Sequence, residues 1–183
     1  MKEANNLVRD FSVSKVIFNS DSYNDLELSL IKLLEQRKIK YYQNVKRVGI
    51  GNLQLSFLNT KLYDNENDNS NVLYFSYFNF QFLLMGDASK KRESDILVNY
   101  NLQNIDFLKV GHHGSNTSSS KEFISKISPK YSLISVGKDN RYGHPKDSVL
   151  DILKDTKIYR TDINGSIEIQ LKKNKYKIRT CSP

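Results

Sequence analysis

The stretch that decides the fold is IDFLKVGHHGS, which runs from Ile105 to Ser115. Its first part is a short, mostly apolar run, and its last part joins two histidines, two glycines and a serine without interruption. Short apolar runs that end in turn residues are typical of strands buried inside an α/β sheet. The stretch therefore predicts a buried strand that ends abruptly in a polar loop.

Two more stretches have the same form: FQFLLMGDAS (80–89) and YSLISVGKDNRYGHP (131–145). In an α/β sheet the carboxyl ends of the strands form the ligand-binding edge. The three histidines of the chain, His112, His113 and His144, all fall in these strand-end clusters. Imidazole is a common zinc ligand and a carboxylate can join two metal ions, so these histidines with Asp87 form a candidate metal shell.

Each of these residues also has a simpler interpretation. Gly86 and Asp87 could form an ordinary turn, His112 and His113 could be an incidental pair, and His144 could only precede the helix expected after Pro145. The placement of all the histidines at strand ends is the observation that favours a site.

The rest of the chain predicts an α/β alternation within a single domain over residues 1–183. Asn24 and Glu27 form a capping-box pattern, followed by leucines at helical spacing as far as Arg37. A hairpin is expected over residues 71–87, with helices near residues 91–101, 120–127 and after Pro145. Further strands are expected over residues 15–18, 40–45 and 53–58 and, at the end of the chain, over residues 157–162, 166–171 and 175–180.

Composition narrows the class of protein. The chain has 183 residues, a net charge of +8 and a single cysteine, which excludes an internal disulfide framework and a cysteine-rich zinc site. No apolar run approaches the roughly 18 residues that span a bilayer. The start, MKEANNLVRDF, has no signal-peptide pattern, so this chain by itself is expected to be cytoplasmic.

The positive charge is concentrated in two clusters that contain no acidic residue. Residues 37–47 include Arg37, Lys38, Lys40, Lys46 and Arg47, and residues 172–179 include Lys172, Lys173, Lys175, Lys177 and Arg179. Such clusters neutralise phosphate backbones, although each could also be a solvated surface. Because most of these residues are lysines, any nucleic-acid binding is expected to be independent of sequence.

Four strings together resemble a known family: LLMGDAS, FLKVGHHGSNTSSS, SVGKDNRYGHP and YRTDINGSIEI. They are similar to the C-terminal metallo-β-lactamase-like domain of ComEC, the DNA-internalisation competence protein of naturally transformable bacteria. The resemblance runs in order from about Lys15 to Ile169. It implies a metallo-β-lactamase-like αββα sandwich that hydrolyses phosphodiesters with zinc or manganese.

The resemblance also implies roles for individual residues. Asp87 would be the aspartate that bridges the metals, His144 the last histidine ligand, and His112 a ligand or part of the cavity wall. Asp87, His112 and His144 are therefore the candidate catalytic and metal residues. The candidate substrate-binding residues are His113, Ser115, Thr117, Ser118, Asn140 and Tyr142, the last two through the loop that carries His144.

The chain departs from the family in its first part. The family carries an HxHxDH motif near its N-terminus, whereas no histidine precedes His112 here. We therefore expect a domain that lacks its first strands, an incomplete ligand set and impaired hydrolysis. The partners expected are DNA, bound through the Lys/Arg clusters, and either a missing N-terminal half or a second copy of the chain. The resemblance also implies a parent family that is attached to a membrane.

Two other functions stay open at this point. One is a non-catalytic DNA-binding module that uses the cationic clusters, and the other is a hydrolase of a small phosphodiester or other ester.

Overall fold

A computed structural model describes residues 2–18, 23–51, 53–58 and 60–182. The chain divides into two compact units, Met1–Lys46 and Arg47–Pro183. The prediction of a single domain over residues 1–183 stays a prediction.

The first unit has two helices and a pair of parallel strands: α1 (Lys2–Asp10), β1 (Lys15–Ile17), α2 (Asp25–Gln36) and β2 (Lys40–Tyr42). The capping box predicted at the start of α2 is present. The Asn24 side chain accepts the backbone N–H of Glu27, and the Glu27 carboxylate accepts the backbone N–H of Asn24. Val8, Leu30 and Leu34 form the centre of a small apolar core. The Arg37 guanidinium, at the end of α2, joins this helix to α1 by donating hydrogen bonds to the carbonyls of Val8 and Arg9.

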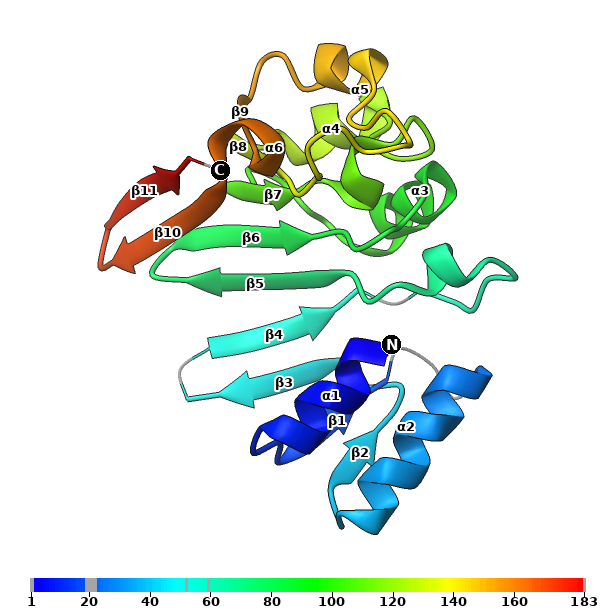
Figure 1. The fold of residues 1–183 in the computed structure, drawn as a ribbon. Coiled ribbons are helices and arrows are strands. Elements are labelled where there is room, and N and C mark those ends of the chain that lie inside the picture. Colours follow the sequence, from blue (N-terminus) through cyan, green and yellow to red (C-terminus); the bar gives the residue numbers. More distant parts are fainter. Residues whose placement is uncertain (1, 19–22, 52, 59, 183) are drawn as a thin grey trace. The chain divides into compact units, whose positions relative to one another are not determined.

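The second unit is built on a seven-stranded sheet in the order β3-β4-β5-β6-β7-β8-β9 (Figure 1). Its strands are β3 (Arg47–Ile50), β4 (Leu53–Phe57), β5 (Leu73–Tyr77), β6 (Phe80–Leu84), β7 (Phe107–Lys109), β8 (Tyr131–Ile134) and β9 (Lys157–Arg160). The pairs from β3 to β6 are antiparallel and those from β6 to β9 are parallel. The α/β class predicted from the sequence is confirmed.

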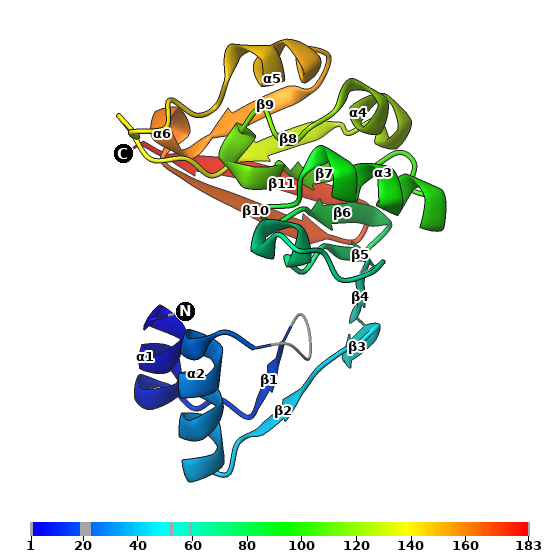
Figure 2. The same cartoon turned by 90° about the vertical axis from the view of Figure 1, so that its right-hand side faces the viewer.

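The two faces of this sheet are covered differently (Figure 2). Helices α3 (Lys90–Asn99), α4 (Lys121–Ile127) and α5 (Asp147–Ile152) pack on one face, around Leu83, Leu108 and Ile134. On the other face lie Phe82, Phe107 and Tyr131, which contact an antiparallel two-stranded ribbon, β10 (Ser166–Lys172) with β11 (Lys175–Cys181). The alternation of side chains along each strand separates the two cores.

Several elements differ from the sequence expectation at their ends. β7 and β8 stop two or three residues earlier than predicted, because the polar loops that follow them begin within the apolar runs. The first turn of α5 lies two residues after Pro145. The Asn-rich segment 64–71 contains a short 3₁₀ helix, η1 (Glu66–Asn69), in which Asp68 is buried. A four-residue helix, α6 (Thr161–Asn164), joins β9 to the ribbon.

Candidate functional site

The three strand-end clusters meet at one edge of the sheet. β6, β7 and β8 are adjacent and parallel, so the loops that follow Leu84, Lys109 and Ile134 leave the sheet side by side. Backbone hydrogen bonds join these loops. The His112 N–H donates to the Gly86 carbonyl at 3.0 Å, and the Lys146 N–H donates to the Gly114 carbonyl at 2.9 Å. The edge predicted from the sequence pattern is therefore a connected structure.

The histidine pair lies in a strained turn, η2 (Gly111–Gly114). His112 has φ 44° and His113 has φ 56°, which places both in the left-handed region that non-glycine residues rarely occupy. Strain of this kind persists where the surrounding structure holds it, and it is concentrated at functional sites. Gly114 closes the turn, and a Cβ on it would lie 2.5 Å from the Cβ of Pro145.

His112 and His144 face each other across two of these loops. Their ring centroids are 6.0 Å apart, and their planes are inclined at 66°. His113 has a different partner, because its Nδ1 lies at the carbonyl oxygen of Ser135 at 2.5 Å. The structure therefore brings two of the three predicted histidines together and gives the third a backbone contact at the end of β8.

The backbone of His144 is held by Asn140. The Asn140 side chain donates to the His144 carbonyl at 2.7 Å and accepts the His144 N–H at 2.9 Å. The exposed ring of Tyr142 stacks on the imidazole, with centroids 5.8 Å apart. Burial lowers the pKa of His144, and the neighbouring charge of Lys146 lowers it further. The neutral imidazole, which is the form that binds metals, is therefore favoured at this position.

Asp87 lies in the turn after β6, one residue from the Gly86 carbonyl that accepts the His112 N–H. Its own backbone N–H donates to the Ser70 hydroxyl at 3.2 Å. Lys109, at the end of the neighbouring strand, is half-buried, and burial lowers its pKa while the charge of Asp87 opposes the shift.

The serine- and threonine-rich loop after the histidines is mostly turned inward. Ser118 is fully buried, with its hydroxyl 2.9 Å from the Gly111 carbonyl and 3.0 Å from the Ser115 carbonyl. Ser115 is 4% exposed, and its hydroxyl lies 3.0 Å from that of Thr117. Thr117 is exposed, and its hydroxyl lies 3.3 Å from Nδ1 of His112. Of the three hydroxyls, that of Thr117 is the one open to solvent beside a histidine.

Two buried carboxylates that hold these loops were missed by the sequence reasoning. Asp68, in the Asn-rich segment, accepts the N–H of Ser89 at 2.9 Å, just after the Asp87 turn. Glu93, in α3, accepts the N–H groups of Ser119 and Ser120. Their sequence surroundings are those of a solvated loop and an ordinary helix, so nothing in the local pattern marks them.

The described residues do not form a complete metal centre. Within residues 2–18, 23–51, 53–58 and 60–182, no three His, Cys, Asp or Glu side chains are placed to hold one ion. A feature that fits a ligand is the buried Nδ1 of His144, which has no hydrogen-bond partner among the described residues. The metal roles predicted for Asp87, His112 and His144 stay predictions.

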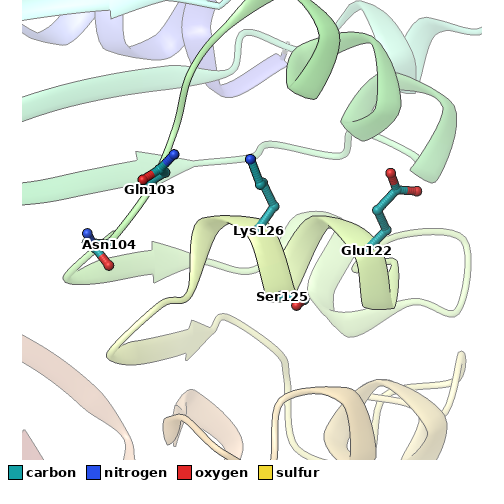
Figure 3. A pocket seen from close by; sticks show the side chains of 5 residues that line it. All are labelled: Gln103, Asn104, Glu122, Ser125 and Lys126. Atoms are coloured by element: carbon teal, nitrogen blue, oxygen red, sulfur yellow. The ribbon is translucent and has the colours of Figure 1, made fainter.

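A cavity of about 500 Å³ lies elsewhere in this unit (Figure 3). Gln103 and Asn104, before β7, form one side, and Glu122, Ser125 and Lys126 of α4 form the other. None of these residues belongs to the strand-end clusters, so this cavity is not the predicted site.

Comparison with known proteins finds three bacterial relatives. ComE operon protein 3 of Bacillus subtilis is 37% identical over 137 residues, 71% of this chain and 18% of that protein. Competence protein ComA of Neisseria gonorrhoeae is 39% identical over 49% of this chain and 13% of its own length. Recombination protein 2 of Haemophilus influenzae is 32% identical over 62% of this chain and 14% of its own length. The chain thus spans less than a fifth of each relative.

No family model matches the chain. Among solved structures, a protein of Thermotoga maritima described as a Zn-dependent hydrolase of the metallo-β-lactamase superfamily overlaps 80% of this chain and 82% of its own, with 13% identity and a TM-score of 0.40. In the part of the chain that the structure describes, no helix is long and apolar enough to cross a membrane.

Proposed function

We propose that this chain, a homologue of a segment of competence proteins of the ComEC type, binds the phosphodiester backbone of DNA at its strand-end edge. The observation that carries the proposal is the pairing of His112 with His144 across two loops that backbone hydrogen bonds hold together. The names of two relatives, a competence protein and a recombination protein, support DNA as the class of substrate.

The residues at the edge are suited to a phosphate group. A neutral imidazole has one N–H to donate, and the exposed Thr117 hydroxyl beside His112 is a second donor. Asn140 holds the backbone of His144 and Tyr142 stacks on its ring, and both contacts lower the ordering cost when a phosphate binds. Asp87 would lie at the β6 side of the same edge.

We further propose that the chain by itself cleaves DNA poorly. A two-metal hydrolase uses its ions to generate hydroxide and to stabilise the attacking and leaving oxygens. The described residues hold no group of three ligands for one ion, and no cleavage step is assigned to them.

A nuclease assay tests the second part. The purified chain is incubated with DNA or with a small chromogenic phosphodiester, in the presence of manganese or zinc, beside Asp87→Asn and a control, Asp151→Asn, whose aspartate is exposed on α5. The expected result is little turnover of either substrate. Robust cleavage that Asp87→Asn abolishes and Asp151→Asn retains would contradict the proposal of poor cleavage.

Histidine NMR tests the first part, because the chain has three histidines and therefore three sets of ring signals. On addition of a thymidine dinucleotide, the signals of His112 and His144 are expected to shift. His113 is the internal control, since its Nδ1 is engaged with Ser135. Equal shifts of all three histidines, or none, would count against phosphate binding at this edge.

A further inference from the structure

The ribbon β10–β11 has one apolar face and one cationic face. Ile167, Ile169 and Leu171 of β10, with Tyr176 and Ile178 of β11, are the half-buried positions, and four of these five pack on the sheet. The alternate positions are exposed. They include Lys172, Lys175, Lys177 and Arg179, with Lys173 at the turn.

Charge on the exposed face is strongly one-sided. Between Ser166 and Cys181 the sequence has five cationic residues and one acidic residue, Glu168. Glu168 lies 3.9 Å from Arg179 across the strand pair, so it offsets part of one charge near the base of the ribbon. Lys172 and Lys175 are directly opposite each other beside the turn, where like charges disfavour pairing. A row of five cations that a single carboxylate offsets only in part is typical of a surface that binds a polyanion.

The geometry of the row fits an extended phosphate backbone. Lys175, Lys177 and Arg179 are alternate residues of one antiparallel strand, so their Cα atoms are about 7 Å apart, from a rise of about 3.4 Å per residue. Neighbouring phosphates along a nucleic-acid strand have a comparable separation. The base of the ribbon is tied to the strand-end edge, because the Thr161 hydroxyl of the preceding α6 contacts the backbone of Val136, in the loop toward His144.

The exposed face favours duplex over single-stranded DNA. Proteins that bind single strands combine cations with aromatic side chains on which bases stack. The exposed positions of β10 and β11 carry no aromatic residue, since Tyr176 lies on the apolar face. A duplex keeps its bases inside and presents one charge per about 1.7 Å of axis.

The other cationic cluster has a different role in the structure. Arg37 is used to join α1 and α2, and the cluster is divided between the two units, with Arg47 at the start of β3. The two clusters are alike in sequence, but only the ribbon places its charges on one continuous surface within one unit.

We infer that the exposed face of β10–β11 is a docking surface for the backbone of duplex DNA, separate from the histidine edge. This inference rests on the proposed function for one point, which is that the chain binds DNA. It assigns the ribbon to holding the duplex and the strand-end edge to contacting an individual phosphodiester.

The test is equilibrium binding of the full chain to a labelled duplex and to one of its single strands, over a range of salt concentrations. The variant is Lys172→Gln/Lys175→Gln/Lys177→Gln, and the control removes the same charge from the first unit, Lys38→Gln/Lys40→Gln/Lys46→Gln. We expect the wild type to bind the duplex more tightly. The ribbon variant should flatten the slope of log K against log salt by about 2.7, from three contacts at about 0.9 each. The control should change the slope by less.

Each other outcome overturns the inference. Tighter binding of the single strand would contradict the preference for duplex DNA. An unchanged slope in the ribbon variant, or an equal loss in the control, would show that the ribbon is not where DNA docks. His144→Ala separates this inference from the proposed function. If His144→Ala reduces duplex binding and the ribbon variant does not, the duplex is held at the histidine edge, so the ribbon inference fails while the proposed function stands. The shifts of the histidine signals on addition of the dinucleotide test the proposed function alone, because the ribbon variant leaves all three histidines in place.

Discussion

Replacing Gly114 by alanine should destabilise the second unit by about 2–5 kcal/mol. Gly114 has φ +81°, and an alanine in a left-handed conformation costs about 1–2 kcal/mol. Its Cβ would also lie 2.5 Å from the Cβ and 3.1 Å from the Cα of Pro145, an overlap that a packed region relieves only by shifting. Overpacking of this kind costs about 1–3 kcal/mol, and the two contributions together give the range stated.

The measurement is urea unfolding followed by far-UV circular dichroism, for Gly114→Ala and for a matched control, Gly137→Ala. A Cβ on Gly137 meets no atom within 4 Å, and its φ is not in the positive range. The control should therefore be neutral or stabilise by up to about 1 kcal/mol, because alanine restricts the unfolded chain.

The same variant has a local consequence for the site. Gly114, in the loop of His112, leaves no room for a Cβ beside Pro145, in the loop of His144, so pushing the two apart should change the ring signals of both histidines. A loss of stability below about 1 kcal/mol, or a loss no larger than that of Gly137→Ala, would refute the argument that this contact holds the two loops together.

Three further outcomes are expected. Asn140→Ala removes both hydrogen bonds that hold the His144 backbone, so it should lower the free energy of unfolding, measured by urea titration, by about 1–3 kcal/mol. It should also broaden the NMR signals of the His144 ring, and unbroadened signals would contradict this prediction. Burial raises the pKa of the Glu93 carboxyl above its ordinary value of 4.5. The protonated carboxyl therefore stabilises the fold fully below pH 4.5, and this stabilisation is lost as pH rises through the pKa of Glu93 in the folded protein. Glu93→Gln should remove this dependence of the free energy of unfolding on pH. If the free energies of unfolding of variant and wild type differ by a constant amount between acidic and neutral pH, Glu93 does not titrate as expected. The hydroxyls of Tyr131 and Tyr176 are 2.7 Å apart, and this hydrogen bond raises the pKa of Tyr131 to about 12. Tyr176→Phe should therefore move the pKa of Tyr131 toward 10.0 in an ultraviolet titration of the phenols. If the pKa of Tyr131 stays near 12 in this variant, burial and not the hydrogen bond causes the shift.

Local patterns in the sequence were sufficient where neighbouring residues decide the structure. The capping box at Asn24 and the helix after it depend on contacts within a few residues, and both are present. The apolar runs that became β6, β7 and β8 were recognisable because a buried parallel strand needs apolar side chains on both faces. Their polar ends could be predicted to share an edge, since parallel strands place their carboxyl ends together.

The contacts of the site depend on pairings that no local pattern records. The distance between His112 and His144 follows from the register of β7 against β8 and from the contact of Gly114 with Pro145. Asp68 and Glu93 support the loops from segments whose composition is that of a solvated surface. Hydrogen bonds between residues far apart in the chain exist only once the sheet has formed.

The sequence by itself determined the α/β class, the strand-end residues and the two cationic clusters. The tertiary structure alone decided which of those residues act together. His113 is directed to Ser135, Ser118 is buried, and Arg37 is engaged with α1, whereas the lysines of β10–β11 share one exposed face. The physical reason is that charge and residue type are properties of a position, while exposure and neighbours are set by packing across the whole unit.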